Sequence, residues 1–284
     1  MNEAPDLRPE DERLDEARLK TAFAGRALGR SLRVYETVGS TQNEARSWAV
    51  AGAPHGALVM AEEQRSGRGR MGRVWHSPSG KGLWMSLVIR TGLTLEQAPH
   101  LTLVTAVAVC RAIRQATGAD ARLKWPNDIL IGGRKIAGIL VELQATEARM
   151  QSLVVGIGIS VNLDQADFPD ELQEKATSLR LVTGNKVDRT GLAIHVVHSL
   201  EEMTGFYLKE GFPPVGSLWE ALSDTLGNQV RVETPLGPVV GKAARLDDNG
   251  ALVVRLDNGE ERKLYSGDLM TNPDGLPGTQ TSRA

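Results

Sequence analysis

Residues 64–76, QRSGRGRMGRVWH, combine four arginines with three glycines and include a tryptophan near their end. Glycine lets the backbone adopt positive φ and lets a ligand approach its N–H groups closely. Arginine supplies a planar fork of donors that suits carboxylate and phosphate, and it stays protonated. We therefore expect a loop here that binds a small anionic ligand.

Three other interpretations of this segment fit less well. Arg/Gly tracts occur in disordered RNA-binding tails, but this one is short, does not repeat, and lies between apolar runs at 57–63 and 83–90. GRGRMG also fits GxGxxG, yet the proline and glycines of 78–82 exclude the helix that a dinucleotide fingerprint requires. The pair Gly80-Lys81 lacks the upstream glycine and the Ser/Thr of a Walker A loop.

Four further segments could contribute to the same site: STQN at 40–43, KWPNDIL at 124–130, RKIAGILVE at 134–142 and GIGISVN at 156–162. Taken singly, each has a structural explanation, such as a helix N-cap for Ser40 or a solvated edge charge for Lys135. Gly138, Gly156 and Gly158 are harder to explain, because glycine inside a strand lowers stability without a gain in packing. They predict a flat ligand lying against the sheet, beside the Lys135 cation.

The elements that must position these residues follow from apolar periodicity. Helices are expected over 11–28, 42–50, 95–117, 188–210 and 214–226, and strands over 31–38, 56–64, 82–90, 121–125, 128–143 (a hairpin around Gly132-Gly133) and 151–163. Residues 163–187 should form a loop with a short helical piece. Because the strands follow one another as hairpins rather than as βαβ units, the main sheet should be antiparallel or mixed.

The texture of the chain changes from Asn228 onward. Short alternating runs are separated by LG, DDNG and DNG turns, which predicts a small β-barrel or hairpin module. We therefore expect an α+β protein with an N-terminal segment and helix at 1–29, a catalytic or binding domain at 30–226, a β module at 227–270 and a flexible tail at 271–284.

Composition limits the class of protein. Hydrophobic residues at 41%, charged residues at 24% and a net charge of −2 are ordinary for a globular protein and provide no overall field that attracts nucleic acid. The single cysteine, Cys110, lies in an apolar run and predicts a buried, inert thiol. There is no secretory signal pattern and no apolar run long enough to cross a membrane, so we expect a cytoplasmic location.

Together, STQN, GRGRMGRVW, KWPND, RKIAGILVE and GIGISVN resemble the motifs of the biotin protein ligases, the biotin–[acetyl-CoA-carboxylase] ligases. The resemblance covers roughly residues 30–270, and GRGRxGRxW and KWPND are its most specific elements. It implies a core like that of class II aminoacyl-tRNA synthetases, with a mixed sheet, followed by an SH3-like β-barrel. It also implies ATP and Mg²⁺ as substrate and counter-ion, biotinyl-5′-AMP as intermediate, and an apo biotin carboxyl carrier protein as acceptor.

The resemblance assigns roles by matching position. Biotin would be bound by Ser40, Thr41, Gln42, Gln64, Arg68, Gly69, Arg70, Lys135, Gly138, Gly156 and Gly158. Arg70 and Lys135 would be the catalytic cations on the carboxylate and the anhydride phosphate. Nucleotide would be bound by Arg70, Arg73, Trp75 (stacking on adenine), Asn127, Asp128 and Ser160, with Asn127 and Asp128 near the ribose, phosphates or Mg²⁺.

These roles agree with the charge changes of the implied reaction. A biotin carboxylate that attacks the α-phosphate brings two anions together, and cations stabilise the charge that develops. No covalent enzyme intermediate is required, and the sequence offers no evident Ser/His/Asp or Cys/His set.

Two positions depart from the family pattern. Gln42 stands where the family has the Asn of STN, and Ser160 stands where it has the first Asn of GINVN. A serine hydroxyl is shorter than the Asn amide, which both donates and accepts. Adenine recognition would then depend on Ser160 together with backbone groups, Asn162 or water.

Other functions remain as alternatives. A lipoate–protein ligase would share the core, but Ser40, Thr41 and Gln64 offer the polar groups that a ureido ring needs. A nucleic-acid-binding module is disfavoured by the net charge and by an aromatic content of 4%. About thirty residues precede the first expected core strand, too few for a winged helix-turn-helix, so we expect no DNA binding. The resemblance also allows a homodimer, and no metal site is expected at His195 and His198.

Overall fold

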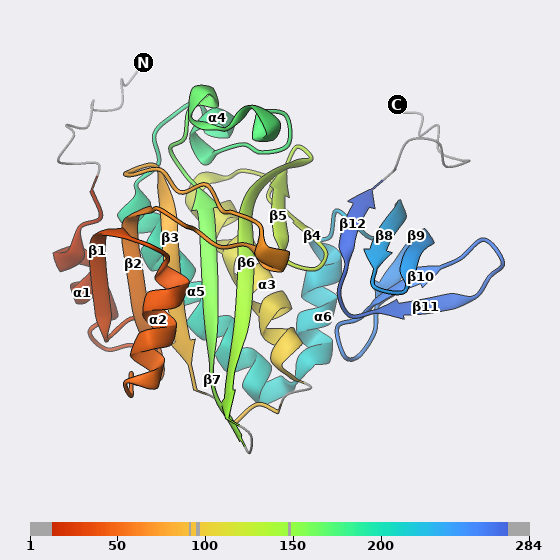
Figure 1. The fold of residues 1–284 in the computed structure, drawn as a ribbon, viewed down its shortest axis with the longest axis horizontal. Coiled ribbons are helices and arrows are strands. Elements are labelled where there is room, and N and C mark those ends of the chain that lie inside the picture. Colours follow the sequence, from red (N-terminus) through yellow and green to blue (C-terminus); the bar gives the residue numbers. More distant parts are fainter. Residues whose placement is uncertain (1–12, 91, 95–96, 147–148, 272–284) are drawn as a thin grey trace.

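The computed structural model describes residues 13–90, 92–94, 97–146 and 149–271. Its main part is a large mixed sheet with helices on both faces, and a smaller sheet lies beside it at the C-terminal end (Figure 1). The predicted α+β class, with a mixed-sheet core followed by an antiparallel β module, is therefore confirmed.

Six α-helices lie in the described ranges: α1 (Glu16–Phe23), α2 (Thr41–Val50), α3 (Ala98–Thr117), α4 (Leu179–Thr183), α5 (Arg189–Glu210) and α6 (Phe212–Ala221). The predicted caps are present, since the Ser40 side chain accepts from Gln42 N and Gly118 ends α3 at φ 69°. The expected helices over 11–28 and 95–117 begin in part outside the described residues. Within these residues, α1 is shorter than expected and α3 agrees closely.

The main sheet has seven strands in the order β1-β2-β3-β7-β6-β5-β4. Their bounds are β1 (Leu32–Val38), β2 (Ala57–Gln64), β3 (Gly82–Ile89), β4 (Arg122–Lys124), β5 (Asp128–Ile131), β6 (Arg134–Thr146) and β7 (Arg149–Ser160). The sheet is mixed, as predicted: β1 and β2, which α2 connects, are parallel, and the other neighbouring strands are antiparallel. Gly132 (φ 57°) and Gly133 (φ 76°) make the tight turn between β5 and β6.

Helices on both faces explain why β3 is buried along its whole length and why the first five residues of β2, Ala57 to Ala61, are apolar and buried. Leu58 and Met60 of β2 belong to the large core shared with α3 and α5, whereas Val59 packs with Ala45 and Ala49 of α2. Side chains of a strand alternate between the two faces, so a strand covered on both sides has no position for a solvated residue. Figure 1 shows α2 on one face of the sheet and α3 with α5 on the other.

The C-terminal module is a five-stranded antiparallel sheet in the order β11-β10-β9-β8-β12. Its strands are β8 (Gln229–Thr234), β9 (Gly237–Leu246), β10 (Leu252–Arg255), β11 (Glu261–Leu264) and β12 (Asp268–Thr271). Gly250 and Gly259 have positive φ in the DDNG and DNG turns, as the turn pattern predicts. The chain up to residue 12 and the predicted tail from residue 272 onward lie outside the described residues. Thr271, the first residue of the predicted tail, is instead the last residue of β12.

The predicted helix over 214–226 is displaced in the structure. Helix α6 begins at Phe212, directly after Gly211 (φ 80°), and ends at Ala221. The following residues leave the helix because they bond to β4: Leu123 N donates to Leu222 O at 2.9 Å, and Asp224 N donates to Leu123 O at 2.8 Å. A tertiary pairing therefore outweighs the local helical pattern.

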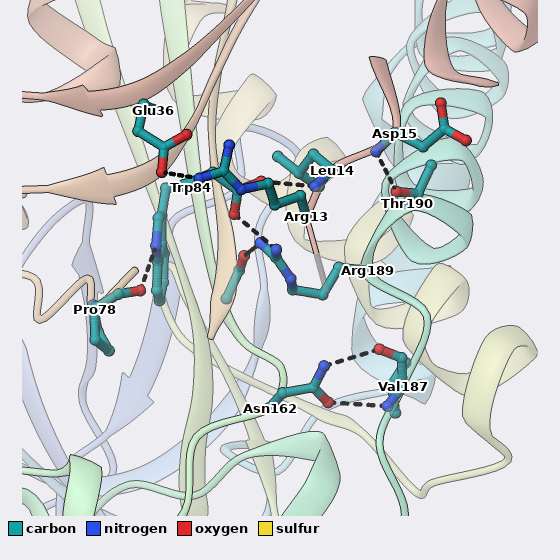
Figure 2. Close-up of polar contacts among 12 residues, drawn as sticks. Arg13, Leu14, Asp15, Glu36, Pro78, Trp84, Asn162, Val187, Arg189 and Thr190 are labelled. Carbon is teal, nitrogen blue, oxygen red and sulfur yellow. Dashed lines mark hydrogen bonds and ion pairs between the residues drawn. The ribbon is translucent and has the colours of Figure 1, made fainter. Parts of the chain in front are cut away.

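A buried ion pair joins the N-terminal segment, β2 and α5 (Figure 2). Arg189 NH2 lies 2.7 Å from Glu62 Oε2, and both side chains are almost fully buried. Glu62 also accepts from Leu14 N at 2.6 Å, and Arg189 donates to Gly82 O at 3.0 Å. Nearby, Asp15 N donates to Thr190 Oγ1 at 3.0 Å. These bonds attach the start of α1 to the sheet and to the start of α5.

Glu62→Ala should lower the free energy of unfolding by about 3–5 kcal/mol, because it removes the buried carboxylate that lies 2.7 Å from the Arg189 guanidinium and accepts from Leu14 N. Urea denaturation measures this change. Glu36→Ala, which breaks the exposed Arg13–Glu36 pair, is the matched control and should cost about 1 kcal/mol or less. Equal losses in the two variants would contradict the importance of the buried pair.

Candidate active site

A cavity of about 330 Å³ opens between the central sheet, the start of α2, the loop after β2 and the C-terminal sheet. All residues predicted for the site line it: Ser40, Thr41, Gln42, Gln64, Arg68, Gly69, Arg70, Arg73, Trp75, Asn127, Asp128, Lys135, Gly138, Gly156, Gly158 and Ser160. The fold therefore brings together segments that are more than 100 residues apart in the sequence.

One end of the cavity is a connected set of neutral polar groups. Gln64 Oε1 accepts from Thr41 N at 2.8 Å and from Thr41 Oγ1 at 3.0 Å, while Gln64 Nε2 donates to Ser77 Oγ at 2.9 Å. Thr41 Oγ1 also lies 2.9 Å from Ser86 Oγ, which donates to Gln42 Oε1 at 3.0 Å. Such a network holds hydroxyl and amide groups in fixed positions, as recognition of a small polar ring requires.

Gln42 is buried and bonded within the chain. Its Nε2 donates to Val154 O at 3.1 Å and to Leu140 O at 3.4 Å, so the side chain bridges the start of α2 to β7 and β6. A Cβ added at Gly156 would lie 2.5 Å from Gln42 Oε1. Gly156 thus provides the space that this long amide occupies, and Gln42 shapes the floor of the cavity.

The other two strand glycines face Trp75. A Cβ added at Gly158 would lie 2.5 Å from Trp75 Nε1, and one added at Gly138 would lie 2.8 Å from Trp75 Cζ3. The flat group that the sequence predicts against these glycines is, in this structure, the chain's own indole. Lys135 Nζ lies 5.1 Å from the centre of the Trp75 ring, within the range of a cation–π contact.

The Arg/Gly loop has a defined closed shape. Gly69 N donates to Arg73 O at 2.7 Å, and Arg73 N donates to Arg70 O at 3.1 Å across a short 3₁₀ turn. A Cβ at Gly67 would lie 2.4 Å from Trp75 O, so the return of the loop requires glycine there. Met71 has φ 55°, a conformation that places strain on a residue with a side chain.

Each predicted cation of the site has a partner from another segment. Arg68 NH2 lies 3.0 Å from Glu142 Oε1, and Lys135 Nζ lies 2.6 Å from Asp128 Oδ1. Arg70 NH1 donates to Asn127 Oδ1 at 2.8 Å. Arg73 forms a two-pronged ion pair with Asp268 of β12. The loop is therefore attached to the sheet, to the KWPND segment and to the C-terminal module.

The electrostatic environment follows from these pairs. Burial lowers the pKa of the Arg70 guanidinium, with Asp128 and Asp268 acting in the opposite direction. The hydrogen bond from Arg73 holds the pKa of the Asp268 carboxyl below its usual value, and the same contact raises the pKa of Arg73. Both members of this pair are therefore charged throughout the neutral pH range.

Two residues considered for adenine recognition have different positions. Ser160 is buried at the end of β7 and lines the cavity. Asn162 donates to Val187 O at 3.0 Å and accepts from Val187 N at 2.9 Å, so its amide is bonded to the segment before α5 (Figure 2). Asn162 is thus bonded within the chain, which leaves Ser160, backbone groups or water for the adenine contact that the resemblance implies.

The structure adds residues that sequence reasoning missed. Ser86 is a lone hydroxyl in an apolar strand, which is the one signal that could have identified it. Lys124 belongs to the KWPND motif itself and also lines the cavity. Asp268 and its neighbours Gly267 and Leu269 come from the C-terminal module, and no local pattern marks them as site residues.

Within the described ranges, no group of three His, Cys, Asp or Glu side chains is arranged to hold a metal ion. His195 and His198 therefore do not form part of such a group. None of the helices in the same part of the chain combines the length and apolar character that crossing a membrane requires.

Comparisons with known proteins identify the family. Residues 34–160 match the Biotin/lipoate A/B protein ligase family, and residues 225–269 match the Biotin protein ligase C terminal domain. The bifunctional ligase/repressor BirA of Bacillus subtilis (strain 168) is 43% identical, over 90% of this chain and 79% of its own length. The biotin–[acetyl-CoA-carboxylase] ligase of Mycobacterium tuberculosis is 33% identical, over 95% of this chain and 99% of its own.

Among solved structures, the biotin protein ligase from Aquifex aeolicus in complex with biotin and ATP superposes with a TM-score of 0.77 at 28% identity. The match covers 85% of this chain and 99% of that one. Sequence relatives, both matched families and the shared fold lead to one conclusion: the chain belongs to the biotin protein ligase family.

Proposed function

We propose that the protein activates biotin with ATP to form biotinyl-5′-AMP and then transfers the biotinyl group to a lysine of an apo biotin carboxyl carrier protein. The observation that carries the proposal is a single cavity that joins two sets of groups. One is the network of neutral polar side chains around Thr41 and Gln64, called here the polar floor, and the other is the cluster of cations. Further support comes from relatives named biotin–[acetyl-CoA-carboxylase] ligases and from a structural neighbour that binds biotin and ATP.

The polar floor suits the ureido ring of biotin. This ring has N–H donors and a carbonyl acceptor, and it needs partners that are already oriented. Ser40, Thr41 and Gln64 offer such groups. Ser86 contacts Thr41 and is itself bonded to Gln42. A dithiolane ring, as in lipoate, could not use these hydrogen bonds, so the floor favours biotin.

The cation cluster suits the adenylation step. A carboxylate oxygen of biotin attacks the α-phosphorus, and pyrophosphate leaves with the electrons of the broken P–O bond. Arg70 and Lys135 neutralise the charge that develops on the reacting phosphate and carboxylate. In the second step a lysine amine of the carrier attacks the acyl carbon, and AMP leaves.

The nucleotide end of the cavity offers Trp75 for stacking on adenine and Arg73 for the phosphates. Asp128 and Asn127 present oxygen atoms there, the donor type that Mg²⁺ prefers, so they fit the role of holding the Mg²⁺ that accompanies ATP. When bound, this ion would neutralise part of the triphosphate charge. Lys135 and Arg70, which contact Asp128 and Asn127 here, would then be released towards the substrate.

The test is an ATP-dependent assay of biotin transfer to an apo carrier domain, detected with streptavidin. Reactions without ATP, with lipoate in place of biotin, and with a carrier whose acceptor lysine is changed to arginine are the controls. Transfer only in the complete reaction supports the proposal. Transfer of lipoate in preference to biotin, or binding of single-stranded nucleic acid without binding of biotin, would replace it with one of the alternatives.

Lys135→Ala should slow the formation of biotinyl-AMP by about 10²-fold, the usual effect of removing one transition-state cation or donor. Pyrophosphate release measures this step, and a thermal melt checks folding. Arg134→Ala, at the neighbouring position of β6 and outside the cavity lining, is the matched control and should keep the normal rate. A folded Lys135→Ala protein that released pyrophosphate normally would show that the assigned role is wrong.

Gly156→Ala should weaken biotin binding by about tenfold, because the new methyl group would meet Gln42 Oε1 at 2.5 Å and disturb the polar floor. Calorimetric titration with biotin measures the change. Adding Gln42→Asn, which shortens the amide by one methylene, should restore part of the affinity. Gly205→Ala is the control, because a Cβ added at Gly205 would meet no atom within 4 Å outside the backbone of its own helix. Weak binding without any rescue would argue against the Gln42 contact as the cause.

Arg70→Gly should still make biotinyl-AMP but release it. The Arg70 guanidinium can cover the phosphate and carboxyl oxygens of the anhydride together. Loss of this contact, worth on the order of 1.5–3 kcal/mol, should speed the release of biotinyl-AMP by about 10- to 100-fold. Serum albumin incubated with enzyme, biotin and ATP would then become labelled on a streptavidin blot.

Arg65→Gly is the matched control for this experiment, since Arg65 lies in the same loop but outside the cavity lining. It should label albumin no more than the unmodified protein does. An Arg70→Gly protein that adenylates biotin and yet leaves albumin unlabelled would refute retention of the intermediate by Arg70.

A further inference from the structure

The contact between Arg73 and Asp268 lies at the border of the two sheets. Arg73 comes from the Arg/Gly loop, and Asp268 is the first residue of β12 in the C-terminal module. Both terminal nitrogens of the guanidinium face the carboxylate: NH1 lies 3.3 Å from Oδ1, and NH2 is bonded to Oδ2. The edge of Arg73 that could bind a phosphate in the same two-pronged way is therefore occupied.

Packing places Asp268 at this point. A Cβ added at the preceding Gly267 would lie 2.3 Å from Val232 Cγ1 and 3.0 Å from Glu233 O, so β12 approaches β8 more closely than any other residue would allow. The same Cβ would lie 3.9 Å from Trp125, which belongs to the KWPND segment. The carboxylate of Asp268 is thus held at the cavity wall by the backbone of β12.

The loop side of the contact is also fixed, but only up to the Arg73 backbone. Arg73 O accepts from Gly69 N at 2.7 Å, and Arg73 N donates to Arg70 O at 3.1 Å. The Arg73 side chain is more than half exposed. It can therefore change partners by rotation of its side chain.

The surrounding charges favour such an exchange. Lys124 and Arg70 also act on the Asp268 carboxylate, and Lys124 lines the cavity beside it. If Arg73 leaves, these cations still compensate the charge of Asp268. A triphosphate brings several negative charges, so it can compete with one carboxylate for a shared arginine.

We propose that the Asp268 carboxylate pairs with Arg73 in the ligand-free protein, and that the phosphates of ATP replace this carboxylate as the partner of Arg73 when ATP binds. The C-terminal module thereby sets the affinity for ATP and restrains the loop before ATP binds. This inference rests on the proposed function, because it takes ATP as the ligand of Arg73.

Asp268→Asn tests the proposal, with Glu261→Gln as matched control. Glu261 lies on β11 at the opposite edge of the same sheet, where it pairs with Arg245 and Arg255. Glu261→Gln therefore removes one carboxylate charge from the same module at a site remote from the loop. In the ligand-free protein, Asp268→Asn should reduce hydrogen-exchange protection of residues 65–74, whereas Glu261→Gln should not. Unchanged protection in Asp268→Asn would overturn the restraint of the loop by this pair.

Binding of ATP gives the second readout. Asp268→Asn should bind ATP about two- to fivefold more tightly, the range expected when one partly exposed ion pair no longer competes. The affinity for biotin should not change, because Asp268 touches no group of the polar floor. Weaker binding of ATP would mean that Asp268 positions Arg73 for the nucleotide, and it would overturn the proposal.

A double-mutant cycle with Arg73→Gln separates competition from a general change in field. In the Arg73→Gln background, Asp268→Asn should no longer strengthen ATP binding, and an equal gain there would refute the exchange. If the unmodified protein binds no ATP, the proposed function fails as well. The hydrogen-exchange experiment on the ligand-free protein still decides whether the Arg73–Asp268 pair restrains the loop.

Discussion

Several cations in one small cavity repel each other and lose hydration, and this constraint governs much of the structure. The protein meets it by giving four of these cations an internal partner: Glu142 for Arg68, Asn127 for Arg70, Asp268 for Arg73 and Asp128 for Lys135. The partners come from three other segments. The three carboxylates among them neutralise charge, and the partners of the arginines determine where the Arg/Gly loop lies.

We therefore expect an anionic substrate to bind by an exchange of partners. A phosphate or carboxylate that enters the cavity takes over donors that are already directed at the chain's own oxygens, so little new order is required of the loop. The net affinity is the difference between the new contacts and those that are lost. This difference can be tuned at positions such as Asp268 that would never touch the reacting atoms.

Local sequence signals predicted most of the fold, and their failures have physical causes. Apolar periodicity and caps predicted α3 and α5 because those helices bury a continuous face and end at glycine. The same periodicity misplaced the bounds of α6, because Leu222 and Asp224 form hydrogen bonds to β4, a contact that no local pattern encodes. For the site, the family resemblance assigned residues that all line the cavity, but Ser86 and Asp268 reach it only through the pairing of strands and the packing of Gly267.

The three strand glycines show how a correct position can have an unexpected occupant. Glycine in a strand indicates that another group approaches the backbone closely, but it does not indicate whether that group is a ligand or a side chain. Here Gln42 and Trp75 fill the space, and both belong to segments that also line the cavity. The flat sheet surface is thus needed to place the groups that would touch biotin and adenine. A larger side chain at Gly156 or Gly158 would displace those groups before it met any substrate.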